Sequence, residues 1–566
     1  MKSIKHTFQV GFALLSPRGR RVLLSYGLVL TALATLDAAA LYFVSKLFTT
    51  GASSNKTLEI DASISTLLII VALFLVKTAF STIASWVAVT SFAREEVQIG
   101  MSNFSNQMGR DWSHQIDSPV TDLYNTVDQG PTNMIQGFLL NVVMIGAEAV
   151  NGLIMLLALL FFQPVTACIA LIYFLAVAYV QHKILSKSST SAGERIVTST
   201  NSVYQLLTDA FNLHKLLSVH SSTSLAAELE KRRNNLADAR AQVTLLNLLP
   251  RYFMELILAI GFALIAGITY AIYGAQGAIS AVTVFAAAGF RLLPIINKIQ
   301  QLVLQLFYTL PRAQLALVDS PSSSEDELKV PALAEFLSLQ HITFSYPSSQ
   351  QPVLNDISVS FQRGLQYAII GPSGAGKTTL VDVCLGLLTP QYGVRSQKRN
   401  LSMAYVPQET YIADLTIEKN IALEWESAAI DGKKAVRAMR QANIESLLDR
   451  EDSVTHISGT SLSGGQKQRI GLARALYKQP DILFLDEFTN ALDAQTEHLV
   501  MKSIHDLRGS TTVVIVAHRL STVRNADQVI YVDDGKILSI GTFDELRRRI
   551  PSLQRQIELG TLHLLD

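Results

Sequence analysis

Cysteine and charge are both scarce in this sequence. Its 566 residues contain only two cysteines, Cys168 and Cys384, which lie too far apart to suggest a disulfide framework or a metal site. We interpret both as packing residues. Charged residues make up 16% of the chain, against roughly 25% in soluble proteins, and apolar residues make up 49%. This balance favours a membrane component, and the net charge of +1 argues against a nucleic-acid-binding protein.

Long apolar runs fill the first half of the chain. A membrane-spanning helix needs about 20 mostly apolar residues, and six stretches meet or nearly meet that length. The last stretch is the weakest, because Arg291 and Pro294 interrupt it. The six predicted spans cover residues 22–48, 64–92, 138–162, 165–185, 252–273 and 279–299.

The links between these spans alternate in length. Those after the second and fourth spans, 93–136 and 187–251, are long and rich in lysine and arginine. The positive-inside rule places such links in the cytosol. Glycine and proline are absent from most of their length, so we expect the membrane helices to continue into the cytosol and turn back.

The second half has a different pattern. A polar segment from Ser320 to Glu327 marks a boundary, and beyond residue 336 short β-rich runs alternate with helical segments. This alternation predicts an α/β domain with a largely parallel sheet. The expected fold class is a two-domain membrane protein, with an all-α six-helix transmembrane domain over residues 1–318, a linker over 319–335 and the α/β domain over 336–566.

The strongest motif follows the predicted strand 366–370. It matches the phosphate-loop pattern G-x-x-x-x-G-K-[ST], in which glycines let backbone N–H groups point at phosphate oxygens in front of a helix N-terminus. The lysine is expected to reach the β- and γ-phosphates of ATP and the first threonine to bind Mg²⁺. The motif and the threonine after it are Gly371, Pro372, Ser373, Gly374, Ala375, Gly376, Lys377, Thr378 and Thr379.

Two acids end a later apolar strand. The run 482–485 leads into Asp486 and Glu487. A buried strand would place Asp486 beside the phosphate loop, where it can hold Mg²⁺ through water. Glu487 would then polarise the attacking water.

A serine–glycine turn between these two motifs is more specific. Ser463, Gly464, Gly465 and Gln466 follow Leu462 and precede a predicted helix, and so make a second anion site. This turn resembles the signature motif of ABC (ATP-binding cassette) proteins. In that family the turn closes on the γ-phosphate bound by the other subunit, so the resemblance implies that one chain cannot complete its own site.

Further elements of the family occur in order. Tyr346 resembles the aromatic residue that stacks on adenine, and Gln408 resembles the glutamine that contacts Mg²⁺ and water. Asp493, after Ala491 and Leu492, resembles the D-loop aspartate. His518 resembles the switch histidine at the γ-phosphate. The resemblance therefore implies ATP and Mg²⁺ as cofactors, with Thr378, Gln408 and Asp486 at the metal and Glu487, His518 and Gln408 in catalysis.

The resemblance extends over nearly the whole chain. Six spans followed by one cassette are similar to exporter-type half-transporters, which include the lipid A flippase and lipid-linked oligosaccharide flippases. The family's coupling helices would lie near 124–128 and 209–216. Two features depart from the pattern: the stretch 377–408 is shorter than usual, and 455–459 lacks the usual glycine–glutamate pair.

The resemblance implies a homodimer, because both hydrolytic residues are present, and a multi-pass protein of the cell inner (plasma) membrane. Its N-terminus, long loops and ATPase domain would be cytosolic. The expected activity is ATP-driven export or flipping of an amphipathic substrate, such as a lipid-linked oligosaccharide or another lipid. A peptide or multidrug exporter, an importer and an ATP-gated channel stay open as alternatives. Ionisable residues in or beside the spans are candidates for the substrate cavity, or pair with one another: Asp37, Lys77, Glu148, Arg251, Glu255 and Arg291.

Overall fold

The computed structural model of the chain consists of two compact units. One comprises Met1–Arg110 and Ser118–Ser322, and the other Asp111–Asp117 and Ser323–Asp566. The residues described are 2–50, 58–109, 112, 119–162, 164–219, 223–317, 335–347, 349, 351–447, 462–489, 492–517, 519–551 and 553–554. Most of the predicted linker, 319–335, lies outside them.

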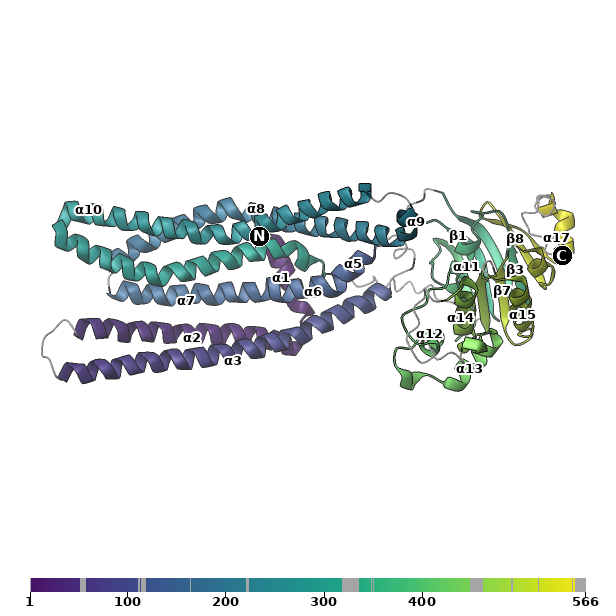
Figure 1. Cartoon of the computed structure of the whole chain (residues 1–566), viewed down its shortest axis with the longest axis horizontal. Coiled ribbons are helices and arrows are strands. Elements are labelled where there is room, and N and C mark those ends of the chain that lie inside the picture. The colour runs from purple at the N-terminus through teal and green to yellow at the C-terminus, as the bar shows by residue number, and fades with distance from the viewer. Residues whose placement is uncertain are drawn as a thin grey trace. The chain divides into compact units, whose positions relative to one another are not determined.

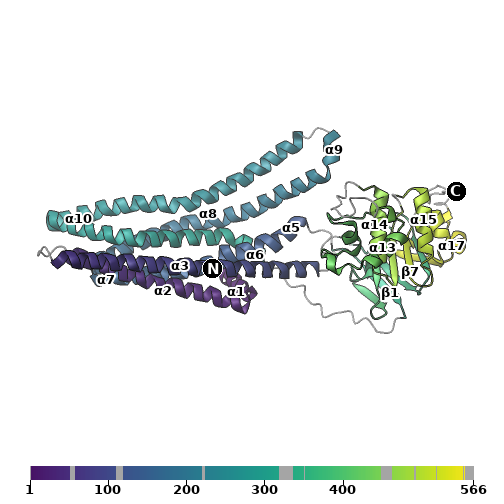
Figure 2. The ribbon, with the colours of Figure 1, turned by 60° about the horizontal axis from the view of Figure 1, so that its bottom comes forward.

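The first unit is built from long helices (Figure 1). Figures 1 and 2 both show α2 running beside α3, and α8 beside α10. The helices are α1 (Lys2–Leu14), α2 (Pro17–Thr50), α3 (Leu58–Met108), α5 (Val120–Tyr124), α6 (Gly130–Thr132), α7 (Leu140–Phe162), α8 (Pro164–Asn212), α9 (His214–Val219) and α10 (Thr223–Gln314), with π-helical turns Asn125–Gln129 and Asn133–Leu139 around α6.

Where the structure describes them, the long links are mostly helical, as the sequence predicts. Helix α3 continues to Met108 and α8 to Asn212, well past the ends of the predicted spans. The predicted coupling segments fall on the π-helical turn after α5 and on the junction of α8 and α9. Among the residues described, three helical stretches are long and apolar enough to cross a membrane: Leu67–Met108, Val120–Leu157 and Ser224–Ala271.

Helix α10 contains the fifth and sixth predicted spans. Its backbone leaves the helical region at Gly274, which has φ 72° and ψ −168°, and this residue separates two limbs, 223–273 and 275–314. Glycine adopts this conformation without a steric penalty. Pro294 interrupts the apolar run of the sixth predicted span but not the helix, which continues through it. A proline removes one backbone hydrogen bond, and packing against neighbouring helices can compensate for that loss.

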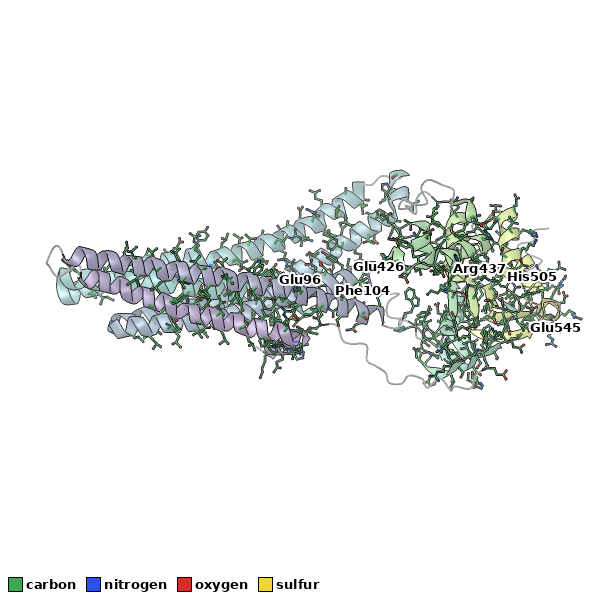
Figure 3. The ribbon with its side chains drawn as sticks, turned by 90° about the horizontal axis from the view of Figure 1, so that it is seen from below. Glu96, Phe104, Glu426, Arg437, His505 and Glu545 are labelled. Atoms are coloured by element: carbon green, nitrogen blue, oxygen red, sulfur yellow. The ribbon has the colours of Figure 1, made fainter. Side chains whose placement is uncertain are left out.

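Buried apolar side chains and polar contacts hold the first unit together. Phe92 of α3 and Phe138 of the second π-helical turn are almost fully buried in one cluster with Leu23 of α2. Glu96 of α3, labelled in Figure 3, accepts hydrogen bonds from Thr132 and from Gln136 (3.0 Å). The helices of this unit therefore pack through both apolar and polar side chains.

The second unit is the predicted α/β domain. A six-stranded sheet has the order β5-β6-β7-β3-β8-β9, in which only the β8–β9 pair is antiparallel, and a separate antiparallel sheet has the order β2-β1-β4. The strands are β1 (Leu337–Phe344), β2 (Leu354–Phe361), β3 (Gln366–Ile370), β4 (Tyr392–Gln397), β5 (Met403–Val406), β6 (Ile482–Asp486), β7 (Thr512–Val516), β8 (Gln528–Asp533) and β9 (Lys536–Gly541).

The strands β3, β6 and β7 are buried along their whole length, which explains their unbroken apolar sequences. Apolar clusters line both faces of the sheet. The helices are α11 (Lys377–Leu385), α12 (Ile417–Ala422), α13 (Gly432–Gln441), α14 (Gly464–Tyr477), α15 (Ala494–His505), α16 (Leu520–Arg524) and α17 (Phe543–Arg549). Cys384, on α11, is fully buried, as expected of a packing residue.

Candidate nucleotide site

The phosphate loop joins β3 to α11 at the carboxyl edge of the sheet, where open α/β domains bind their ligands. Gly371 has φ 153°, and a Cβ there would lie 1.9 Å from the carbonyl oxygen of Val532. Gly374 and Gly376 also have positive φ, 80° and 94°. The glycines at the ends of the motif are thus required by the path of the backbone, which curls in front of the N-terminus of α11.

Lys377 folds back over this loop. Its Nζ donates hydrogen bonds to the carbonyl oxygens of Gly371 (3.0 Å) and Pro372 (2.8 Å), and the side chain is buried. Burial lowers the pKa of the ammonium group, whereas the carboxylates of Glu487 and Asp486 act in the opposite direction. The lysine therefore provides a positive charge inside the loop that would hold a nucleotide's phosphates.

Asp486, at the end of β6, lies beside the first turn of α11. The hydroxyl of Thr378 donates to its Oδ2 (3.3 Å), and the hydroxyl of Tyr405 donates to the same oxygen (3.4 Å). Burial raises the pKa of the Asp486 carboxyl, and the hydrogen bond from Thr378 opposes that shift. A carboxylate beside a hydroxyl is the oxygen donor set that Mg²⁺ prefers, so these residues fit the metal of a Mg–nucleotide complex.

Glu487 follows directly and is paired with Gln408. The amide Nε2 of Gln408 donates to Glu487 Oε2 over 3.0 Å. Glu487 has φ 46°, in the left-handed region that few residues other than glycine adopt. Strain of this kind costs about 1–3 kcal/mol and clusters at functional sites. The backbone turn thus directs the second acid away from the strand and toward the predicted glutamine.

Asp382, on α11, was not singled out by the sequence. Burial, with a smaller effect of the Asp486 charge, raises the pKa of its carboxyl to about 6. The unfolded chain has a pKa near 3.9, so the folded state binds this proton more tightly, and stability falls as the pH rises from about 4 to about 6. An aspartate there therefore destabilises the domain at neutral pH.

Asp382→Asn should therefore stabilise the protein by about 1–3 kcal/mol at pH 8, and by less at pH 5. Thermal unfolding in EDTA without nucleotide measures both values. Asp506→Asn, at an exposed position, is the matched control. An equal effect of Asp382→Asn at the two pH values would contradict the raised pKa.

The signature turn begins helix α14. Ser463 is the N-cap, and its hydroxyl accepts a hydrogen bond from Gln466 N (3.2 Å), while Gln466 Oε1 accepts one from Ser463 N (2.9 Å). Among the residues described, no hydrogen bond joins Ser463 to the phosphate loop. The turn is thus a preformed helix N-terminus, with Ser463 and Gly464 exposed and Gly465 and Gln466 half-buried.

Of the other predicted cassette residues, the structure describes Tyr346 and Asp493 but not His518. The Tyr346 hydroxyl lies 3.3 Å from the Thr379 hydroxyl, which places the aromatic residue beside the phosphate-loop helix. Asp493 caps α15 by accepting a hydrogen bond from Thr496 N (2.9 Å). His518, Ala491 and the segment 455–459 lie outside the described residues.

In the helical unit, three of the candidate cavity residues form ion pairs. Arg251 Nε and Glu255 Oε1 are 3.0 Å apart on one exposed face of α10, and Glu148 of α7 pairs with Lys298 of α10. The side chains of Asp37 and Arg291 lie outside the described residues. The alternative that these groups pair with one another therefore holds for Arg251 with Glu255. Lys298 was missed, although a lysine near the end of the sixth predicted span was a visible signal.

Comparisons with known proteins agree with this geometry. A family model described as ABC transporter matches residues 354–490. The beta-(1→2)glucan export ATP-binding/permease protein NdvA of Agrobacterium vitis is 40% identical over 242 residues, which are 40% of this chain and 41% of that protein. The mitochondrial ATP-binding cassette sub-family B member 10 of Mus musculus is 39% identical over 238 residues, which are 39% of this chain and 33% of that protein.

The chain spans between 19% and 43% of the length of three curated relatives that it matches. In contrast, the solved structure of a bacterial Atm1-family ABC exporter with ATP bound is matched over 97% of this chain and all of that chain, with a TM-score of 0.78 and 18% identity. At that identity the likeness establishes the fold. This chain therefore carries the nucleotide-binding domain of the ABC transporter family, joined to a helical domain with the fold of an ABC exporter.

Proposed function

We propose that the chain is half of a homodimeric exporter or flippase driven by ATP hydrolysis. The observation that carries this is the convergence of Lys377, Asp486 and Glu487 at one sheet edge, while the hydrogen bonds of Ser463 stay within its own helix. A nucleotide held by the phosphate loop then needs a second anion-binding turn from elsewhere. A second copy of the chain supplies one by symmetry.

The proposed domains are a transmembrane domain over 1–318, a linker over 319–335 and a nucleotide-binding domain over 336–566. Tyr346 stacks on adenine, the loop 371–379 holds the phosphates, and Thr378, Gln408 and Asp486 hold Mg²⁺. The metal, when bound, neutralises charge on the phosphate oxygens. The N-terminus, the long loops and the ATPase domain are cytosolic, in a multi-pass protein of the inner membrane.

In the hydrolytic step we assign to Glu487 the role of general base. Its carboxylate accepts a proton from the attacking water, and Gln408, already bonded to it, fixes its orientation. Lys377 stabilises negative charge on the transferred phosphoryl group. His518 is assigned the contact with the γ-phosphate, and Ser463, Gly464, Gly465, Gln466 and Asp493 belong to the surface that meets the partner's nucleotide.

A cavity of about 420 Å³ in the helical unit favours an amphipathic cargo. Residues from the fourth predicted span, between 173 and 185, and from the start of the fifth, between 253 and 257, line this cavity. Its lining is apolar, including Leu185, Phe253 and Ile257, except for the Tyr173 and Gln181 side chains. Gln181 is buried, and its amide has no hydrogen-bond partner among the residues described. An apolar chain with one polar group would satisfy both features.

The cargo is tested by ATPase activity in liposomes. A lipid-linked oligosaccharide should stimulate hydrolysis several-fold in the wild-type protein, whereas peptides and hydrophobic cations should not. Lys377→Ala, which removes the loop's charge, should abolish hydrolysis with every addition. Stimulation by peptides or hydrophobic cations alone would favour the peptide or multidrug exporter, and hydrolysis that no membrane addition changes would count against coupled transport.

A further inference from the structure

A second cavity, of about 410 Å³, lies within the helical unit and has a different character. It is formed where the segment around α5 meets α8 and both limbs of α10. Its volume falls within the range of sites for small organic molecules. Its wall includes Tyr124, Asn201, Tyr204, Arg240, Tyr308 and Arg312.

Charge on this wall has one sign. Two arginines, Arg240 and Arg312, come from different limbs of α10, and none of the described residues that line the cavity is acidic. The nearest acid along the chain is Asp128, which accepts a hydrogen bond from the lining residue Gln129 (3.0 Å) but does not itself line the cavity. Two guanidinium groups without a carboxylate favour an anion, because arginine binds oxyanions through paired N–H donors.

The tyrosine side chains of the wall are already ordered by contacts with other residues of the wall. The ring of Tyr308 lies 5.1 Å from the Arg312 guanidinium, which also donates to the Tyr308 hydroxyl (2.7 Å). Tyr124 and Tyr204 meet edge to face, with centroids 6.2 Å apart. These contacts fix the tyrosines and one arginine before any ligand arrives, which lowers the ordering cost of binding.

A hydrogen bond also links α8 to the π-helical turn after α5. Asn125 Nδ2 donates to Asn201 Oδ1 over 2.9 Å, and both residues line the cavity. Gln129 Nε2 donates to the Tyr124 hydroxyl (3.1 Å). Amides and hydroxyls of this kind can recognise the polar part of a ligand whose charged group lies at the arginines.

The cavity lies beyond the predicted spans. Its first residue on α8 is Ile196, eleven residues past the end of the fourth predicted span at Leu185, which corresponds to about 16 Å of helix. Arg312 is similarly far past the end of the sixth span at residue 299. The ligand is therefore reached from water, and a lipid headgroup at the bilayer surface is disfavoured.

We propose that this cavity binds a small soluble organic dianion of the phosphate monoester class, with its phosphate at Arg240 and Arg312 and its organic part among the tyrosines. A phosphate monoester carries close to two negative charges at neutral pH, which matches the two arginines. The inference rests on the proposed function only in placing the cavity outside the membrane.

Titration calorimetry on the purified full-length protein tests the site, with phenyl phosphate as the probe. Saturating ADP and Mg²⁺ keep the cassette occupied. Wild-type protein should bind the probe at one site per chain, and Arg240→Gln and Arg312→Gln should each weaken binding about tenfold or more. Arg233→Gln, an exposed arginine on the same helix, should leave it unchanged.

Two further arms separate the outcomes. Equal binding by all variants, or no binding by the wild type, would overturn the proposal. Arginine-dependent binding of short-chain phosphatidic acid without binding of phenyl phosphate would overturn the soluble ligand in favour of a lipid headgroup. Nucleotide-induced thermal stabilisation in each variant shows that it is folded, and a wild type that binds the probe but hydrolyses no ATP would contradict only the proposed transport function.

Discussion

Glu487→Gln should lower the rate of ATP hydrolysis by about 10²–10⁴-fold while nucleotide binding persists. The substitution removes the carboxylate that accepts a proton from water, and an amide oxygen can still accept the hydrogen bond from Gln408 that Glu487 Oε2 now accepts. The side chain keeps nearly the same size, so the backbone turn at residue 487 should be retained. Steady-state phosphate release and binding of a fluorescent ATP analogue measure the two quantities separately.

The control for this variant is Glu424→Gln, which changes the same functional group at an exposed position in the same unit. It should hydrolyse ATP at the wild-type rate. ATP-driven movement of cargo into vesicles should stop in the Glu487 variant. Repeated transport of cargo by that variant would mean that nucleotide binding alone drives movement, as in a gated channel. That result would refute the proposal of a pump driven by ATP hydrolysis.

Ser463→Asp should lower hydrolysis in the homodimer by about 10²-fold or more, with little change in the stability of α14. Aspartate is as good an N-cap as serine, so the hydrogen bond from Gln466 N should be kept. The new negative charge would instead repel the partner's γ-phosphate. Thr542→Asp, at the N-cap of α17, changes a second capping box in the same way and should leave hydrolysis intact.

A mixed dimer gives the sharper measurement. One copy carries Ser463→Asp and the other Lys377→Ala, and each homodimer alone should be inactive. If each site combines one copy's phosphate loop with the other copy's serine turn, the mixed dimer retains one intact site, and activity reappears. If each chain completed its own site, both sites would be damaged, and a mixed dimer without activity would refute sharing.

The sequence could predict the cassette because its motifs are contiguous and local. The phosphate loop must follow a strand and precede a helix, and the structure places it between β3 and α11. The predicted strand 366–370 and the apolar run 482–485 match β3 and β6 within one residue. Apolar runs of four to five residues between polar turns are typical of buried strands and too short for most helices.

The neighbours of the site could not be predicted in this way. Tyr405, which donates to Asp486, is 81 residues from it in sequence, and Glu148 and Lys298 are 150 residues apart. Such pairs depend on which strands are adjacent and on how far each helix is rotated about its axis. A single sequence carries no local signal for either quantity.

The local sequence pattern thus determined the two units, the phosphate loop and the two acids at the end of β6. Each of these features depends on the hydrophobic period and the turn residues of a short segment. Packing decided the rest. The strand order brings Gln408 to Glu487, and the packing of α8 against α10 places Arg240 and Arg312 on the wall of one cavity. These residues meet only when helices and strands separated by tens to hundreds of residues bury their apolar faces together.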